Sequence, residues 1–465
     1  MWKLILKNLW ARRRRNGWLL AELILVSIIS WVILDPVIVV THDRNIPLGY
    51  DADRLCLVSL AALQPNAPGY NAEAQDSVSL VDGYLSLVRH AGSFEGVELA
   101  TPLLGFCYPN SQGNGNTSYT AEGDTVPHQV MWMQFLPHTQ FFETYGFRPG
   151  TGRTPRQLSD YDYTQQDIVL TENAAYEIFG TKDAQGKRTV SYSRGDTLYK
   201  QVIGTLGTIK AYSDWRPTSV AFIPTLSIDA GDIPDYAQIL IRVKENVSMK
   251  RFIHDFRPWM LKEMRRGNLF ARCISPYSDL IADLEADSSA PIYRRNLAMA
   301  VFFLLNLCLG VIGTFWLQTR ARREEVGVML SFGATPRRIV CQLLGEGTVL
   351  TVIASLTGFL AYLQYAMKEG LDNGLDWHNS SVTAWSSNFW TAAVEPLETY
   401  WVSDFTQHFF IVSLVILLIL LAVVLVGIYI PARSFSRIPP TEALREEYDT
   451  TCSDSRKRTE CPLSD

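Results

Sequence analysis

The sequence lacks the motifs of the common enzyme and metal-binding classes. None of its seven cysteines forms a C-x-x-C pair, so a zinc site is not expected. It has no G-x-S-x-G turn and no H-E-x-x-H motif. The stretch GTKDAQGKRT, which starts at Gly180, resembles a phosphate loop, but Arg188 stands where Ser or Thr would ligate magnesium. We therefore expect a non-catalytic chain with no cofactor or metal site of its own.

Charge is also sparse. Charged residues make up 19% of the 465 residues, against about 25% in typical soluble domains, and the net charge is −5. No basic, aromatic-interleaved domain stands out, so nucleic acid is not an expected partner. If the middle of the chain lies outside the cytoplasm, Cys56 and Cys107 could form a disulfide; small buried thiols are an equal alternative.

The apolar residues gather in long runs near the two ends of the chain. A helix needs about 20 apolar residues to cross a bilayer. Three runs meet this length without a charge: Leu297–Leu317, Gly347–Met367 and Phe409–Pro431. We interpret all three as membrane-spanning helices.

A fourth run, Trp18–Val40, contains Glu22 and Asp35, one near each end. Acids near the ends of a span cost less than acids at its centre, so this run also qualifies as a span. The alternative is a cleaved signal peptide. No small-x-small cleavage signal follows the run, so a retained anchor is favoured.

The flanking charges predict the orientation of these spans. In chain order, arginines precede the first run (Trp18–Val40) and follow the second (Leu297–Leu317) and the last (Phe409–Pro431). The segment Glu369–Gln407 has neither Lys nor Arg. The positive-inside rule therefore puts both termini and the Arg320–Arg338 segment in the cytoplasm, and the long middle outside. Arg294, Arg295 and Lys368 run against this assignment but are outnumbered.

The predicted fold class is an integral membrane α-helical protein with four transmembrane helices and a large α+β extracytoplasmic domain between the first and second spans. The N-terminal MWKLILKNLW places its tryptophans near one helical face, which suits a helix lying in the inner interface; a plain basic flank is the alternative. The expected divisions are a basic N-terminus at 1–16, a span at 17–40, an α+β domain at 41–290 with a β-rich part at about 150–230, a helical membrane module at 291–446 with spans near 296–318, 345–368 and 408–431, and a polar tail at 447–465.

Within the α+β domain, hydrophobic periodicity predicts several elements. Helices are expected in DSVSLVDGYLSLVRHA and MKRFIHDFRPWMLKEMRR. DIVLTENAAYEIFG is typical of a strand that runs into a helix, with its start near Thr171 and its stop at Gly180. Further strands are expected in VMWMQFL, YKQVIGTLG, SVAFIP and AQILIRVKE.

The segment between the runs Leu297–Leu317 and Gly347–Met367 has the pattern of a helical hairpin. Helix-favouring residues continue to Phe332, and Gly333 is a natural helix stop. Thr335 can cap the next helix, with Pro336 at its first position. Arg337 and Arg338 then lie in a first turn, where the helix macrodipole disfavours cations. Anionic lipid headgroups or a docking protein could each explain them.

These residues carry a resemblance. REEVGVMLSFGATPRRIVCQLLGEG resembles the FtsX-like permease module of ABC transporters of the MacB and LolC/LolE type. The matching positions are Glu325, Gly327, Gly333, Ala334 and Glu346, the last an intramembrane acid close to the start of the third span. The ending IPARSFSRIPPTEALRE is similar to the ending of that family, at Pro431, Ala432, Pro440, Glu442, Ala443, Leu444 and Arg445. FFETYGFRPGTGR, IVLTENAAYEIFG and QVIGTLG resemble a MacB-type periplasmic core domain.

The resemblance implies a permease that transmits the work of a separate cytoplasmic ABC ATPase to a periplasmic domain, which acts on a substrate there. Its implied partners are that ATPase, a second permease copy (identical or a sibling), membrane lipid, and a periplasmic adaptor or substrate protein, all at a bacterial inner membrane. The implied ATPase-coupling hairpin consists of Arg322, Arg323, Glu324, Glu325, Gly327, Gly333, Ala334, Thr335, Pro336, Arg337 and Arg338. An FtsX-like regulator of cell-wall enzymes and a membrane-anchored sensor remain alternatives.

Overall fold

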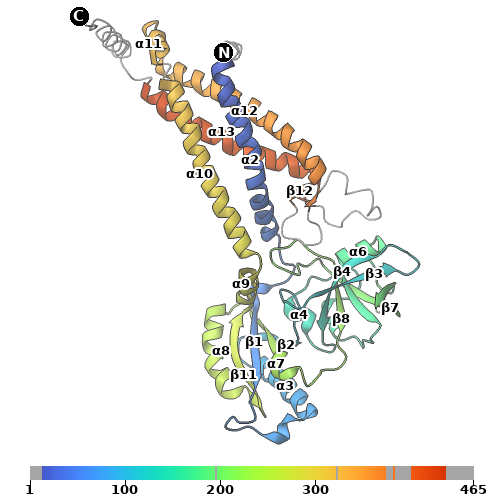
Figure 1. Cartoon of the computed structure of the whole chain (residues 1–465). Helices are drawn as coiled ribbons and strands as arrows, with labels where there is room; N and C mark the ends of the chain where they lie inside the picture. Colours follow the sequence, from blue (N-terminus) through green and yellow to red (C-terminus); the bar gives the residue numbers. More distant parts are fainter. Residues whose placement is uncertain (1–12, 194–195, 321–322, 373–380, 383–399, 436–465) are drawn as a thin grey trace, which may run out of the picture.

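The computed structural model describes residues 13–193, 196–320, 323–372, 381–382 and 400–435. The expected N-terminal interfacial helix lies outside these residues, as does the C-terminal motif Pro440, Glu442, Ala443, Leu444 and Arg445. The described chain has two parts: a bundle of long helices, and an α+β region that lies beyond one end of the bundle (Figure 1).

The α+β region contains a five-stranded antiparallel sheet with the order β10-β11-β1-β9-β2. Its strands are β1 (Leu55–Ala62), β2 (Val97–Leu104), β9 (Ala237–Val243), β10 (Arg265–Arg266) and β11 (Leu269–Pro276). The helices α3 (Ser77–Gly92) and α8 (Met249–Glu263) pack on this sheet, in agreement with the helices expected from periodicity. Short helices connect these elements: η1 (Ala52–Arg54), η2 (Ala72–Gln75) and α7 (Ile233–Tyr236).

Strand β1 is buried on both faces of the sheet. Leu55 and Leu57 belong to a core shared with Phe142 and Tyr145, whereas Cys56 points into the core under α3 and α8. A strand buried on both faces shows no alternation of polar and apolar residues. This explains why the sequence pattern did not predict β1.

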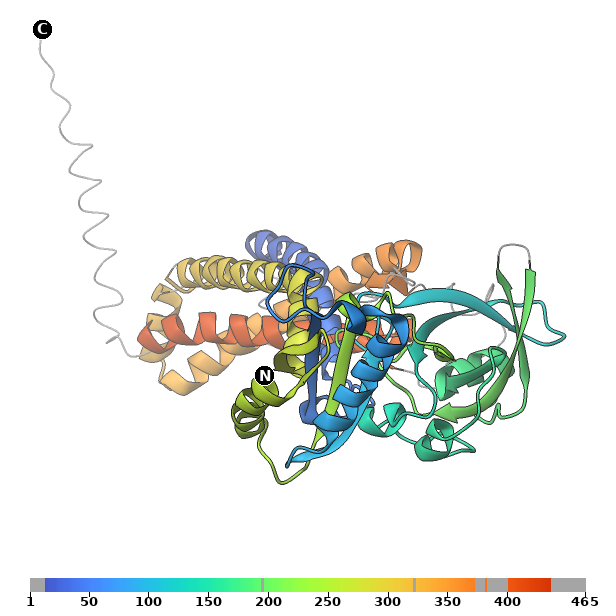
Figure 2. The same ribbon diagram turned by 90° about the horizontal axis from the view of Figure 1, so that it is seen from below.

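A closed six-stranded barrel with the order β3-β4-β8-β5-β7-β6 is inserted between β2 and β9. Its strands are β3 (Gly115–Ala121), β4 (His128–Phe135), β5 (Asp167–Thr171), β6 (Arg188–Ser193), β7 (Asp196–Leu206) and β8 (Val220–Pro224), with α4 (Phe141–Tyr145), α5 (Pro155–Ser159) and α6 (Glu172–Phe179) between them. The β-rich part thus begins at Gly115 rather than near residue 150. Seen from below, the barrel lies to one side of the sheet (Figure 2).

Four helices among the described residues are long and apolar enough to cross a membrane. They are α2 (Arg13–Asn45), α10 (Ala290–Arg320), α12 (Pro336–Glu369) and α13 (Phe405–Phe435). Each extends beyond the apolar run that predicted it, because polar residues at the ends continue the helix. A further helix, α9 (Tyr277–Asp287), joins β11 to α10, and α11 (Arg323–Ser331) lies between α10 and α12. The two-residue strands β12 (Leu371–Asp372) and β13 (Ser381–Val382) pair after α12.

Close packing holds the bundle together. A Cβ atom at Gly347 would collide with Cδ1 of Ile428, so a larger residue there would require the Ile428 side chain to shift. The ring of Trp31 stacks on Tyr362 at 4.7 Å and on Phe409 at 5.3 Å between centroids. Its indole nitrogen donates to Ser413 at 3.1 Å. One α2 side chain thereby contacts both α12 and α13.

The cysteines of the α+β region are thiols. Cys56 and Cys107 are both free, and the Sγ atom of Cys56 lies 2.9 Å from Sδ of Met249. Burial raises the pKa of Cys56 to about 12, so this thiol stays protonated at neutral pH. Of the two alternatives that the sequence left open, the structure shows thiols rather than a disulfide.

Helix α8 offers a matched test of the core. Phe256 is fully buried between α8 and the sheet, whereas Leu261 on the same helix is 63% exposed. We expect Phe256→Ala to lower the free energy of unfolding by about 3–5 kcal/mol and Leu261→Ala by less than about 0.5 kcal/mol. Denaturant unfolding of the detergent-purified chain, followed by near-UV circular dichroism, measures both. Equal effects would contradict the described packing.

Candidate functional site: the helical hairpin and the membrane junction

The hairpin predicted from sequence lies at the end of the bundle opposite to the α+β region (Figure 1). Helix α11 ends in two backbone bonds: Gly333 N donates to Leu330 O at 3.0 Å and Ala334 N to Met329 O at 2.9 Å. Gly333 has a φ of +85°, so these bonds form a Schellman ending with glycine in the left-handed position. The expected helix stop at Gly333 is confirmed.

The start of α12 agrees with the prediction in position but not in chemistry. Thr335 is the N-cap residue and Pro336 occupies the first turn, yet the Thr335 side chain makes no capping hydrogen bond. The carbonyl of Thr335 instead accepts from the amides of Arg338 and Ile339, at 3.0 and 3.3 Å. The sequence therefore located the turn and the N-cap residue correctly, although the Thr335 side chain forms no capping bond.

The outer surface of the hairpin combines positive charge with an apolar side chain. Arg337 and Arg338 are exposed at the start of α12. Phe332 is 88% exposed immediately before the turn, whereas Ile339 is buried and anchors α12 in the bundle. Sequence reasoning did not single out Phe332. Its signal was a bulky apolar residue next to a helix-stopping glycine in a charged segment.

The other hairpin residues are only partly described. Gly327 is buried and Ala334 half-buried. Helix α11 includes Arg323, Glu324 and Glu325, whose side chains are outside the described part of the structure. Arg322 is outside the described residues. Glu346 is buried in α12, one turn or more below the hairpin surface.

A second cluster joins the helices to the barrel, and we call it the membrane junction: Asp43, Arg44, Lys210, Ser213, Arg216, Glu285 and Ser403. At its centre is Lys210, a fully buried lysine. Its ammonium group donates to the carbonyls of Asp43 at 2.9 Å and Ile46 at 3.3 Å, and also to that of Ser213. Because the carbonyls at a helix C-terminus have no partner within the helix, a cation there stabilises the end of α2.

The charge on Lys210 persists at neutral pH. Burial lowers the pKa of Lys210 to about 8, and nearby carboxylates, of which Asp43 acts most strongly, oppose this effect. A pKa of about 8 leaves most of the ammonium protonated at pH 7. The end of α2 is therefore fixed to the barrel by charge-assisted hydrogen bonds.

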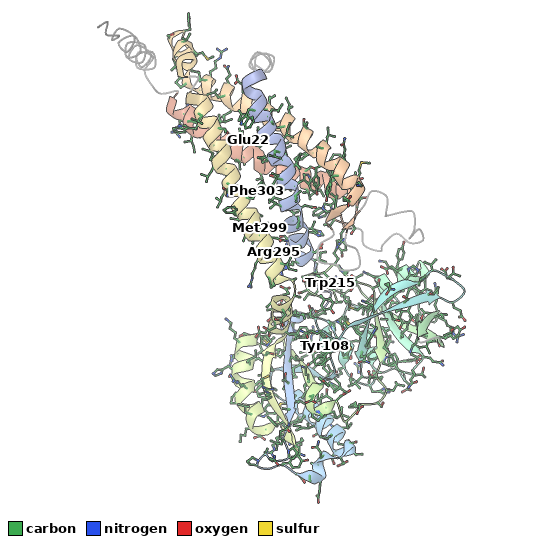
Figure 3. The ribbon with its side chains drawn as sticks, viewed as in Figure 1. Glu22, Tyr108, Trp215, Arg295, Met299 and Phe303 are labelled. Atoms are coloured by element: carbon green, nitrogen blue, oxygen red, sulfur yellow. The ribbon has the colours of Figure 1, made fainter. Side chains whose placement is uncertain are left out.

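Ion pairs at the junction connect α2 with three further segments. Arg44 pairs with Glu285 of α9 at 3.0 Å, and Glu285 also accepts a hydrogen bond from Ser213 of the barrel. Arg216 lies 3.5 Å from the carboxylate of Asp43 and donates to Ser403, just before α13, at 2.6 Å. Figure 3 shows the neighbouring Trp215 at the border between helices and barrel.

Comparisons with known proteins identify the bundle. Residues 297–440, which include α10, the hairpin, α12 and α13, match the family model of the FtsX-like permease C-terminal domain. The C-terminal part of this chain is an FtsX-like permease module. The resemblance noted in the hairpin sequence is thereby confirmed, and the four apolar helices are those of a membrane protein.

Two solved structures are similar to about half of the chain. One is a domain of a protein named as a candidate permease from Porphyromonas gingivalis, with 16% identity and a TM-score of 0.31, covering 49% of this chain and 92% of that one. The other is the periplasmic region of MacB from Actinobacillus actinomycetemcomitans, with 12% identity and a TM-score of 0.29, covering 51% and 94%. No curated protein matches the chain.

The permease helices also bury polar groups at the level of the membrane. His408 Nε2 lies 2.7 Å from Asp35 Oδ1, and His408 Nδ1 lies 3.0 Å from the Val402 carbonyl. A carbonyl oxygen only accepts, so Nδ1 carries a hydrogen. Nε2 of His408 and the Asp35 carboxylate share a buried hydrogen bond. This bond ties α2 to α13 close to the membrane junction.

Glu22, the other acid of the first span, lies nearer the hairpin end of the bundle (Figure 3). One of its carboxylate oxygens is buried without a hydrogen-bond partner among the described residues, and the other would lie 3.7 Å from a Cβ atom at Gly310 of α10. Burying a carboxylate oxygen without a hydrogen bond costs free energy, so Glu22 at this contact between α2 and α10 is a candidate functional residue.

Replacing Lys210 tests the membrane junction. Lys210→Met keeps the apolar stem but removes the ammonium donors from the end of α2. We expect the amides of residues 46–50 and 207–216 to exchange hydrogen roughly 100-fold faster, a loss on the order of 3 kcal/mol for charge-assisted bonds. Hydrogen exchange with mass spectrometry measures this. Lys262→Met, at an 82% exposed side chain, is the control; unchanged exchange in Lys210→Met would refute the role of the ammonium.

Proposed function

We propose that this chain is the permease subunit of an ABC transporter and transmits the work of a separate cytoplasmic ATPase to its α+β region. The observation that carries the proposal is the hairpin of the FtsX-like module, where exposed Phe332, Arg337 and Arg338 form one surface at the far end of the bundle. An apolar side chain beside cations on a fixed turn fits a protein partner better than lipid headgroups alone, because headgroups need only the charge.

Helix α10 offers a direct mechanical path between the two ends of the molecule. It runs without interruption from Ala290 to Arg320, roughly 45 Å at 1.5 Å per residue. Ser288 and Ser289 separate its start from α9, which follows strand β11 of the sheet, and its last residue is three positions before the start of α11. A displacement of the hairpin would therefore reach the α+β region through one long helix and its short connection to α9.

A second permease copy completes the proposal. Only 6% of the most apolar window of α10 is buried within the chain, against 28–44% for the other three spans. An α10 face this exposed is available to lipid and to a second copy, identical or sibling. Two copies brought together by an ATPase dimer would move two α+β regions against each other, and with them a periplasmic substrate or adaptor.

The proposed setting is a bacterial inner membrane, with both termini and the hairpin in the cytoplasm and the α+β region in the periplasm. The positive-inside rule supports it, because Arg337 and Arg338 lie on one side and the described α+β region on the other. Glu346 and the C-terminal residues Pro440–Arg445 belong to the same module and are proposed to support the cytoplasmic contacts.

Two natural cysteines test this orientation. Cys273 is exposed in the α+β region and Cys341 is exposed near the start of α12. In spheroplasts, a membrane-impermeant maleimide should label a variant whose sole cysteine is Cys273. A variant with Cys341 alone should be labelled only after permeabilisation, because its thiol faces the cytoplasm. Labelling of Cys341 in intact spheroplasts would overturn the orientation.

Charge reversal tests the docking surface. We expect Arg337→Glu with Arg338→Glu to reduce co-purification of the ATPase by about tenfold or more, since two attractive contacts become repulsive. The matched control is Arg294→Glu with Arg295→Glu, an exposed pair at the other end of the permease module. Quantitative mass spectrometry of the affinity-purified chain gives both ratios. Full ATPase recovery with the first variant, or no ATPase with the unmodified chain, would reject the proposal.

A further inference from the structure

A pocket lies beside the membrane junction, where α2 leaves the bundle. Its volume is about 360 Å³, within the range of small-ligand sites. Three parts of the chain line it: the end of α2 and the loop after it, the barrel, and the segment before α13. The lining residues are His42, Asn45, Ile46, Pro47, Gly49, Arg148, Thr208, Pro217 and Tyr400.

The walls of this pocket are held in place by the backbone. Gly207 N donates to Arg148 O at 2.9 Å, and Lys210 N donates to Leu48 O at 2.9 Å. The Lys210 ammonium also binds the carbonyl of Ile46, at 3.3 Å. The loop after α2 and the two barrel segments are thus joined to one another before any ligand binds, which lowers the entropic cost of binding.

The polar groups of the pocket are suited to an anion. None of the described residues that line it is a carboxylate. The guanidinium of Arg148 is exposed and makes no ion pair or side-chain hydrogen bond with the described residues. Asn45 donates to the Thr41 carbonyl at 2.8 Å and has a second amide hydrogen. Asp43, next to His42 in the chain, is buried and paired with His42 and Arg216 rather than facing the pocket.

The depth of the pocket points to the source of that anion. The apolar run of the first span ends at Val40, and His42 and Asn45 follow at 1.5 Å per residue, about 3–8 Å further along the helix. The headgroup layer extends roughly 5–7 Å beyond the hydrocarbon core on each side. The end of α2 therefore brings the pocket to the level of lipid phosphates, and Ile46, Pro47 and Pro217 add apolar surface beside the polar groups.

We propose that this pocket binds the phosphate group of a membrane phospholipid headgroup, with Arg148 as its main charged contact and Asn45 as a neutral donor. A guanidinium matches two phosphate oxygens at once, which a neutral donor cannot do. The site is independent of the proposed ATPase coupling. Through the loop after α2 it places a lipid directly against the segment that Lys210 fixes to the barrel.

Native mass spectrometry of the full chain in uncharged detergent tests the site. The probes are phosphatidylglycerol, diacylglycerol with the same acyl chains but no phosphate, and inorganic phosphate as competitor. We expect Arg148→Gln to weaken phosphatidylglycerol binding by about tenfold, as one lost charged contact implies. Asn45→Asp, which introduces a carboxylate into the pocket, should weaken it as well. Arg156→Gln removes the same charge from an exposed position of the same barrel insertion and should leave binding unchanged.

Each other outcome overturns part of the inference. Phosphatidylglycerol binding that Arg148→Gln leaves intact would place the lipid elsewhere on the chain. Equal, Arg148-dependent binding of diacylglycerol would show that the phosphate is not recognised. Displacement of the lipid by millimolar inorganic phosphate would identify a site for free phosphate and reject the headgroup. None of these results depends on whether an ATPase binds the hairpin, so the two proposals fail separately.

Discussion

The architecture depends on how the end of α2 is attached to the barrel. A helix C-terminus leaves carbonyl oxygens without partners inside the helix, and in this chain the buried Lys210 ammonium binds the carbonyl of Asp43 in the last turn of α2 and that of Ile46 just after it. A buried ammonium is stable only when its hydrogens are bonded, so Lys210 and the α2 carbonyls each need the other. The bundle and the α+β region consequently meet at a charged contact rather than across a flexible linker.

Two connections of different kind thus join the α+β region to the membrane part. Through α9 and α10 the connection is covalent and helical, from strand β11 to the hairpin. Through the membrane junction it is electrostatic, with Arg44–Glu285 and Arg216–Asp43 beside Lys210. An α+β region held at two points tilts when α10 moves relative to α2, whereas a region held at one point would only be carried along. Such a two-point attachment would suit the transmission of motion proposed for this chain.

Much of this could be predicted from sequence. Charge-free runs predicted three of the four long helices. The fourth was predicted from Trp18–Val40, because its two acids lie near the ends of the run. Gly333 predicted the hairpin turn because glycine adopts the left-handed backbone conformation that ends such a helix more easily than other residues do. Patterns with clear periodicity, such as α3, α8 and β5 with α6, were also found in the expected places.

What could not be predicted has physical reasons. Strand β1 is buried on both faces and shows no alternation, and the barrel starts in a Gly- and Asn-rich stretch that is typical of a loop. The membrane junction joins Asp43 to Lys210, 167 positions apart, and a lone lysine gives no sign of where it will be buried. Arg148 likewise stands out only once its exposure and neighbours are known.

Transmission itself is the central claim, and distance measurement in the assembled complex tests it most directly. With the partner ATPase bound, a spin label at Leu261→Cys in each of two copies would report the separation of the α+β regions by pulsed electron paramagnetic resonance. Our account predicts that a non-hydrolysable ATP analogue shifts this distance, and that Lys210→Met abolishes or broadens the shift while the ATPase stays bound. No shift in the unmodified complex, or an identical shift in the Lys210→Met complex, would contradict the account.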